Sequence, residues 1–153
     1  MKTFLLILTL LVAFGFTANS QYIQELEGLY YADSSPYSGV YKSYHDNFQL
    51  KVEMPLNEGM KDGVIKIYFD NGQLNEVRSY KQNQMHGNWL TYSEQGVKLA
   101  EAYYVDGKKD STWKIWDENG TLRVEMTYKN GEKTGVWKRW DEKGNVIGEK
   151  RYN

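Results

Sequence analysis

From residue 38 onward, short apolar and aromatic segments alternate with polar segments, and this pattern recurs every 24 residues. The apolar segments, such as GVWKRW at 135–140, are rich in aromatic and β-branched residues, which is typical of β-strands. The polar segments, such as DNG at 70–72 and ENG at 118–120, end in glycine, the residue that adopts the left-handed conformation of hairpin turns most easily. Each unit is therefore predicted to be one β-hairpin.

Glycines mark two positions of every unit, without insertion or deletion. The first position holds Gly39, Gly63, Gly87, Ser111 and Gly135, and the second holds Phe48, Gly72, Gly96, Gly120 and Gly144. The five units span 38–61, 62–85, 86–109, 110–133 and 134–153, the last of which is truncated. Because a lone hairpin is marginal in water, the units must join. The sequence thus predicts an all-β fold, an elongated single-sheet array of antiparallel β-hairpin repeats.

Aromatic residues follow the same interval in three rows. Two places after the first glycine stand Tyr41, Ile65, Trp89, Trp113 and Trp137; five places after it stand Tyr44, Tyr68, Tyr92, Trp116 and Trp140; near the unit's end stand Leu56, Tyr80, Tyr104, Tyr128 and Tyr152. Side chains alternate between faces along a strand, so Trp113 and Trp116 should point to opposite faces. Either a bulge realigns them or both faces are partly aromatic.

The second row, Tyr44, Tyr68, Tyr92, Trp116 and Trp140, is the candidate binding surface. Exposed tyrosine and tryptophan can stack on sugar rings or receive apolar side chains of a partner. The alternative is that this row forms the shared core between hairpins. Binding specificity would then lie at the positions that vary between units, Ser43, Ile67, Thr91, Ile115 and Arg139. Only the last two units carry tryptophan in both the first and the second row. Trp116 and Trp140 are therefore the leading candidates for binding within the second row.

The first twenty residues read as an export signal. Lys2 is followed by an apolar run from Phe4 to Phe16 and then by small and polar residues up to Ser20. That run is shorter than the roughly 20 residues of a membrane-spanning helix. We expect cleavage after Ser20, with cleavage after Ala18 as the alternative. The predicted mature chain is periplasmic or secreted, without a transmembrane segment.

The composition of the chain argues against several kinds of site and function. The chain has no cysteine, which excludes disulfides and thiolate zinc sites. The formal net charge is -1 with lysines spread along the chain, so no basic stripe points to nucleic acid. His45 and His86 occupy different places in their units, which argues against a shared metal site. No nucleophile motif is present, and we predict a non-enzymatic protein without metal or cofactor.

Carboxylates recur in the turns and in the second strands. They are Asp70, Glu94, Glu118 and Glu142 in the turns, and Glu53, Glu101, Glu125 and Glu149 in the strands. A row at strand spacing does not form a glycosidase cleft, and each turn supplies too few oxygens for calcium. We expect turn capping and cross-strand pairing with basic residues instead, namely Lys114, Arg123, Lys138 and Arg139.

The repeated pattern G-x-W-x-x-[YW]-x-x-x-G, best kept over 62–145, resembles the MORN-repeat variant family, which includes exported bacterial proteins and antitoxins of the YwqK type. Residues 21–37 look like the capping half-repeat that opens such arrays. The resemblance implies a twisted hairpin array used as a binding or scaffold surface. Our first hypothesis is a protein-binding or scaffold module, antitoxin-like or immunity-like. The alternative is an envelope glycan-binding or lipid-binding module that uses the aromatic row. Free sheet edges also allow end-to-end self-association.

Overall fold

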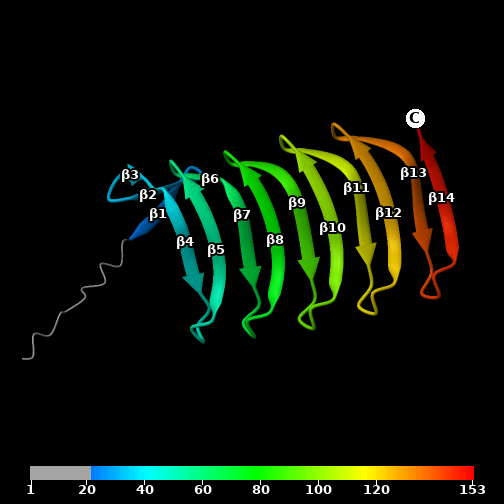
Figure 1. Cartoon of the computed structure of the whole chain (residues 1–153), viewed down its shortest axis with the longest axis horizontal. Coiled ribbons are helices and arrows are strands. Elements are labelled where there is room, and N and C mark those ends of the chain that lie inside the picture. Colours follow the sequence, from blue (N-terminus) through cyan, green and yellow to red (C-terminus); the bar gives the residue numbers. More distant parts are fainter. Residues whose placement is uncertain (1–21) are drawn as a thin grey trace, which may run out of the picture.

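The computed structural model describes residues 22–153, which fold into β-strands joined by turns (Figure 1). The predicted signal peptide, residues 1–20, lies outside this range. Among the described residues, no helix is long and apolar enough to span a membrane.

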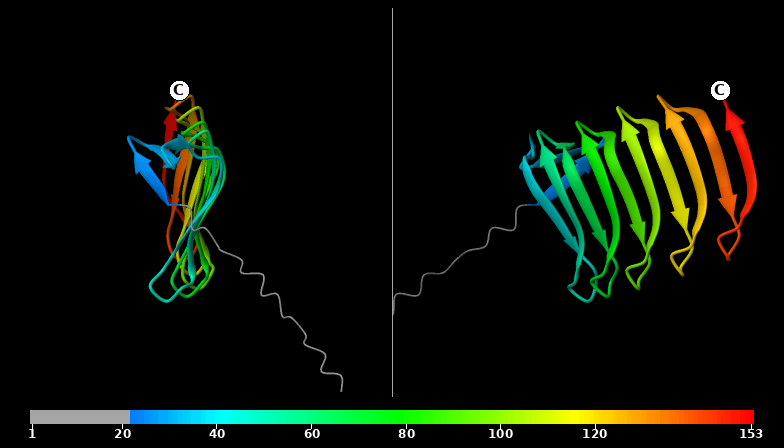
Figure 2. Two further views of the ribbon diagram at one scale, coloured as in Figure 1. Left: turned by 90° about the vertical axis from the view of Figure 1, so that its left-hand side faces the viewer. Right: turned by 45° about the vertical axis from the view of Figure 1, so that its right-hand side comes forward.

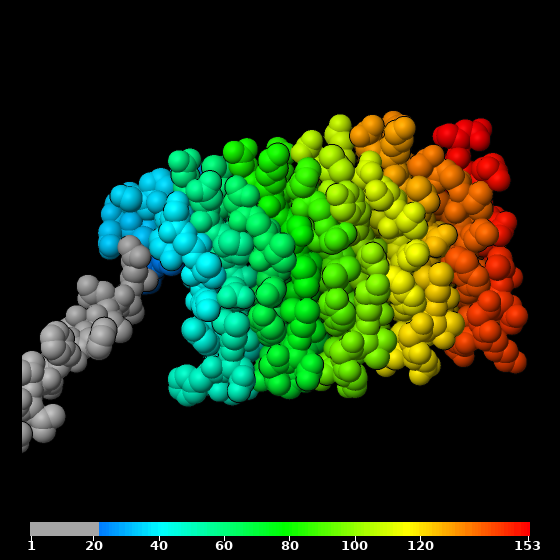
Figure 3. All heavy atoms as spheres, viewed as in Figure 1, coloured from blue at the N-terminus to red at the C-terminus, as the bar shows by residue number. Residues whose placement is uncertain are grey.

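One sheet of 11 strands accounts for most of the chain. Its hairpins are β4 (Gly39–Tyr44) with β5 (Leu50–Asn57), β7 (Gly63–Tyr68) with β8 (Leu74–Lys81), β9 (Gln84–Tyr92) with β10 (Lys98–Val105), β11 (Lys108–Trp116) with β12 (Leu122–Lys129), and β13 (Glu132–Trp140) with β14 (Val146–Tyr152). Neighbours in sequence are antiparallel neighbours in space, and the short β6 (Met60–Lys61) pairs with β5. Figure 3 shows the units following one another from one end to the other. The predicted fold class is confirmed.

The glycine pattern has a direct backbone cause. Gly72, Gly96, Gly120 and Gly144 close the hairpin turns with φ between 79° and 83°. Phe48 takes the same place with φ 66°, at the cost of a left-handed backbone that side chains resist. The first-position glycines also have positive φ, and Ser111 adopts φ 58° among them. Both departures from glycine therefore keep the local conformation that the repeat requires.

The register shifts at two positions of the repeat, near the turn in all five hairpins and at the first position in the last three. One lies at the first glycine, where the register shifts between Glu125 and Thr127 opposite Gly135, for example. The other lies near the turn, where Trp116 pairs with Leu122 and leaves Arg123 as an extra residue. Neither bulge inserts a residue between Trp113 and Trp116, so these two side chains keep opposite faces. Of the two alternatives, the realigning bulge was wrong, and the structure has the other: both faces carry aromatic residues.

A second, small sheet caps the array at its N-terminal end. It contains β1 (Ile23–Leu26), β2 (Leu29–Ala32) and β3 (Ser35–Pro36) in that order. Seen edge-on, it stands on one side of the otherwise single-layered main sheet (Figure 2). Backbone hydrogen bonds tie it down: the N–H of Tyr30 donates to the Gly59 carbonyl at 2.9 Å, and the N–H of Gly59 donates to the Tyr37 carbonyl at 2.8 Å.

The hydrophobic core lies where this cap covers the main sheet. Tyr30 of the cap packs with Met54, Leu56 and Ile65, which are 5% exposed each. The cluster extends as far as Tyr80 of β8. Beyond that point the main sheet has no second layer among the described elements, so most side chains of its strands are half-buried or exposed, and Tyr128 on β12, at 7% exposed, is the exception. Burial is thus concentrated at one end of the molecule.

Candidate binding surface

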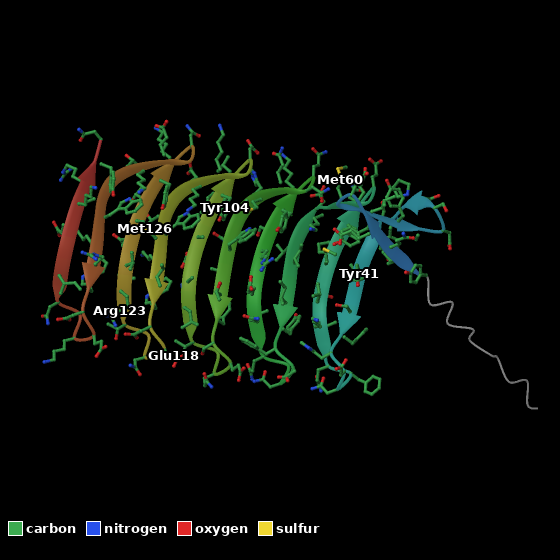
Figure 4. The ribbon with its side chains drawn as sticks, turned by 180° about the vertical axis from the view of Figure 1, so that it is seen from behind. Tyr41, Met60, Tyr104, Glu118, Arg123 and Met126 are labelled. Carbon is green, nitrogen blue, oxygen red and sulfur yellow. The ribbon has the colours of Figure 1, made fainter. Side chains whose placement is uncertain are left out.

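One face of the sheet carries a continuous row of aromatic rings, and we call it the aromatic face. The rings alternate between the second strand of one hairpin and the first strand of the next: Tyr80, Trp89, Tyr104, Trp113, Tyr128, Trp137 and Tyr152. Successive centroids lie 4.8 to 5.7 Å apart, with planes inclined by 49° to 62°. Tyr104 and Met126 of this face are labelled in Figure 4. Tilted contacts of this kind add about 0.5–1.5 kcal/mol per pair beyond burial.

The tryptophans of this row are also fixed by hydrogen bonds to the backbone. The indole N–H groups of Trp89, Trp113 and Trp137 donate to the carbonyl oxygens of Ser79, Tyr103 and Thr127, at 3.3, 3.1 and 3.1 Å. These acceptors lie beside the bulges made at the first glycines. Each glycine and the tryptophan two places after it therefore act together.

Lysines lie over the rings along one edge of the row. The ammonium of Lys109 lies 4.5 Å from the Trp113 centroid and 5.1 Å from that of Tyr128. Lys133 lies 4.8 Å from the Trp137 centroid and 5.4 Å from that of Tyr152. Lys61 contacts Tyr30 and Tyr80 in the same way. These cation–π contacts leave the ammonium groups beside an apolar row, accessible to an anion.

The two faces differ in charge between β9 and β14. Cross-strand partners share a face, and this rule places Lys109, Lys133, Arg139 and Lys150 on the aromatic face. The strand carboxylates Glu101, Asp110, Glu125, Glu132 and Glu149 all fall on the opposite face. Over these strands the aromatic face is therefore positively charged as well as apolar.

The opposite face carries a ladder of alternating charges, and we call it the ladder face. Lys42 pairs with Glu53 at 3.4 Å, Lys114 with Glu125 at 3.8 Å and Lys138 with Glu149 at 3.5 Å. The cross-strand pairing predicted for Lys114 and Lys138 is thus present. Arg123 instead binds a turn, 3.2 Å from Asp117, and Arg139 lies on the aromatic face opposite Gly148.

The predicted candidate row, Tyr44, Tyr68, Tyr92, Trp116 and Trp140, lies on the ladder face near the hairpin turns. Tyr44 is 58% exposed and the other four are half-buried. Lys98 lies over the Trp116 ring at 4.5 Å. The ring–ring stacking that joins the units runs through the other row, so the interpretation of these five residues as the shared core was wrong. Their role in binding stays a prediction.

The variable positions Ser43, Ile67, Thr91, Ile115 and Arg139 share the aromatic face with the stacked row, two residues after its first-strand members. Sequence comparison of the units already separated these positions from the invariant ones. What it missed was the lysine set Lys61, Lys109 and Lys133, each two places before a first-position residue. Because these lysines all occupy one position of the 24-residue repeat, the interval alone could have identified them.

The remaining candidates have structural partners. His45 Nε2 lies 2.9 Å from the Tyr68 carbonyl oxygen, and His86 Nδ1 lies 3.2 Å from Asp106 Oδ1, so the two histidines are not brought together. Residues 22–153 contain no group of metal-ligating side chains. The turn carboxylates Asp70, Glu94, Glu118 and Glu142 are exposed, and the later turns are capped by the preceding Ser93, Asp117 and Asp141 instead. That part of the capping prediction was wrong by one position.

An open sheet of identical hairpins, stacked through one aromatic row, defines a β-repeat protein with a long accessible surface. Its sequence matches the MORN repeat variant family in four tandem repeats, residues 61–82, 85–106, 109–130 and 133–153. The chain belongs to this family. A search of curated proteins found no match.

Proposed function

We propose that this chain is an exported, non-enzymatic module that binds another protein on the aromatic face of β9–β14. The observation that carries the proposal is the unequal cover of that face. The cap packs over Met54, Leu56 and Ile65, whereas the tryptophans from Trp89 onward have no covering layer. The tryptophan rings are half-buried and Ile115 beside them is 41% exposed. Tryptophan, tyrosine and arginine are enriched in protein interfaces.

The sequence of the covered part supports the same interpretation. Where the cap lies, the two most buried members of the row are the aliphatic residues Leu56 and Ile65, which have no polar group to keep hydrated, and Tyr41 and Tyr80 pack at the margin of this cluster. Where it is open, the row uses tyrosine and tryptophan, whose polar ends tolerate partial exposure. A surface built to remain accessible until a partner binds needs residues of the second kind. An antitoxin-like, immunity-like or envelope-scaffold role would all use such a surface.

Site-specific photo-crosslinking tests this proposal. A benzophenone amino acid replaces Ile115, which is 41% exposed on the aromatic face, or its neighbour Lys114 on the ladder face. In cells of the organism that encodes the chain, we expect one protein to be crosslinked through position 115 and not through position 114. Crosslinking only through position 114, or through neither position, would count against the proposal.

A second candidate function rests on the exposure of Tyr44 and Phe48, 58% and 89%, at the turn end of the ladder face. Glycan or lipid binding through the row that contains Tyr44 and Trp116 would use these rings. Titration with cell-wall glycans and with anionic vesicles should then change the tryptophan fluorescence, and Trp116→Ala should reduce that change. Unchanged spectra with both ligands would remove this candidate.

A further inference from the structure

The last two hairpins form a hollow on the aromatic face, with a volume of about 360 Å³. Val124, Met126, Trp137 and Tyr152 supply its apolar lining, and Arg139 and Lys150 supply positive charge at its border. It exists because Gly148 occupies the place that Val124 holds in the preceding unit, 24 residues earlier. Without a side chain at 148, the guanidinium of Arg139 lies over the backbone of β14 and borders the hollow.

Arg139 is positioned over this glycine. Its Nη2 lies 3.1 Å and its Nε 3.3 Å from the point where a Cβ at position 148 would stand. Gly148 and Arg139 are also direct cross-strand partners. A larger residue at 148 would therefore fill the hollow and displace the guanidinium in one step.

We propose that this hollow is the anchor point of the partner: it receives one apolar side chain that is flanked in the partner's sequence by carboxylates. This inference rests on the proposed protein-binding function. The apolar lining selects the side chain, and the cations on this face select the flanking charge. Arg139 and Lys150 lie at the border, and Lys133 lies over the adjacent rings of Trp137 and Tyr152. Lys138 and Glu149 also line the hollow, but the Glu149 carboxylate is paired with the Lys138 ammonium at 3.5 Å on the ladder face. The other strand carboxylates of β9–β14 lie on the ladder face as well.

The charge complementarity distinguishes this occupant from a second copy of the chain docked face to face. Two aromatic faces of β9–β14 would bring Lys109, Lys133, Arg139 and Lys150 against the same cations. Like charges placed in contact oppose association. An acidic segment with an apolar residue is the partner that satisfies both the hollow and its border.

Nuclear magnetic resonance titration with short peptides tests the proposal directly. The probes are acetyl-Glu-Phe-Glu-amide, its neutral counterpart acetyl-Gln-Phe-Gln-amide, and acetyl-Glu-Ala-Glu-amide. We expect the first to shift the indole N–H resonance of Trp137. The neutral peptide lacks the charge pairs with the border cations, and the alanine peptide lacks most of the apolar contact in the hollow. Each should therefore bind at least about fivefold more weakly. Equal affinity for all three peptides, or no shift at Trp137, would overturn the proposal.

Variants of the full chain complete the test. Gly148→Val should abolish the shift at Trp137, and Arg139→Gln should weaken binding of the acidic peptide by about threefold. Lys42→Gln is the matched control, because Lys42 is a ladder-face lysine paired with Glu53 at 3.4 Å and lies on β4, away from the hollow, and it should leave binding unchanged. Circular dichroism and melting confirm that each variant folds, and Gly148→Ala, which adds only a methyl group, serves if the valine variant does not.

Crosslinking in the variants distinguishes a failure of the hollow as anchor from a failure of the protein-binding function. Crosslinking through position 115 that persists in Gly148→Val would leave the protein-binding function standing and overturn the hollow as its anchor. Loss of crosslinking in Gly148→Val, together with normal crosslinking in Lys42→Gln, is the expected result.

Discussion

The indole N–H of Trp137 donates a hydrogen bond of 3.1 Å to the backbone carbonyl of Thr127, on the neighbouring strand. Thr127 lies where the register shifts beside Gly135, and ladder pairing is interrupted there. The tryptophan thus supplies a donor where the bulge disturbs the backbone pairing, and its ring at the same time contacts Tyr128 and Tyr152. The residue at the first position and the tryptophan two places after it therefore act together in three units, with glycine at the first position in two of them and Ser111 in the third.

Removing the indole donor should weaken the array without disrupting it. Trp113→Phe keeps an aromatic ring between Tyr104 and Tyr128 but loses the bond to the Tyr103 carbonyl. We expect the free energy of unfolding to fall by about 1–2 kcal/mol, the cost of an unpaired polar group plus some ring area. Urea denaturation measures this change in the free energy of unfolding. Trp116→Phe, on the ladder face, is the control and should cost less; equal losses would refute the special role of the bond.

Substitutions of two first-position glycines should differ in cost. Gly135 has φ 68°, and an added Cβ would lie 3.6 Å from that of Thr127, an ordinary contact. Ser111 already adopts φ 58° at this position of the repeat. Gly87 has φ 97°, and its Cβ would lie 3.1 Å from the Cβ of Ser79.

We therefore expect Gly135→Ser to cost about 1 kcal/mol and Gly87→Ser about 2–3 kcal/mol, because only the second combines an unfavourable φ with a close contact. Thermal melting of the two variants against the parent chain measures the difference. A Gly135→Ser variant as unstable as Gly87→Ser would show that neither the larger φ of Gly87 nor its close contact with Ser79 adds to the cost.

The repeat interval was enough to predict the hairpins, because every unit has the same length and its turn glycine adopts the same positive φ. The parity of Trp113 and Trp116 along one strand was enough to place them on opposite faces. It did not show which of the two rows joins the units. That depends on the register between hairpins, which the bulges at Gly87, Ser111 and Gly135 set.

Residues 21–37 were predicted to cap the array, but their position over one face of the first units was missed, although a signal for it was present. Leu56 and Ile65 stand where later units have tyrosine and tryptophan, and aliphatic residues in an otherwise aromatic row indicate a buried place. The polarity of the two faces could not be predicted before the register was known. Arg139 and Glu149 are both close to the turn in sequence, yet they lie on opposite faces.

The lysines over the aromatic row should stabilise it by their charge. Lys133→Met keeps a long apolar side chain, and methionine is the natural occupant of this place in another unit, at Met85. We expect the free energy of unfolding to fall by about 0.5–1 kcal/mol, the usual size of an exposed cation–π contact. Lys133→Arg retains the charge and should retain the stability. Chemical denaturation of the three proteins decides, and a methionine variant as stable as the parent would mean that the charge contributes nothing.

The hairpin turns should make the array sensitive to acid. Asp117 Oδ1 accepts the backbone N–H of Thr121 at 2.9 Å and that of Asn119 at 3.0 Å, and these bonds, with Arg123, lower the pKa of this carboxyl. Hydrogen bonds to Asn145 and Lys143 lower the pKa of Asp141 in the same way. A folded-state pKa below the unfolded value means that the stabilisation is complete above about pH 4 and is lost as the pH falls through the folded pKa.

The chain contains the matched replacement for this test. Ser93 holds the equivalent place in the preceding turn, and its uncharged Oγ accepts the N–H groups of Gln95 at 3.3 Å and Val97 at 3.2 Å. Serine thus keeps the turn bonds without a titrating group. The double variant Asp117→Ser, Asp141→Ser should be somewhat less stable than the parent at pH 7, because bonds to a charged acceptor are stronger. Between pH 5 and pH 2.5 it should lose less stability than the parent, since two depressed carboxyls no longer take up protons. Parallel melting curves across that range measure the difference, and an unchanged slope would show that the turns do not carry the acid sensitivity.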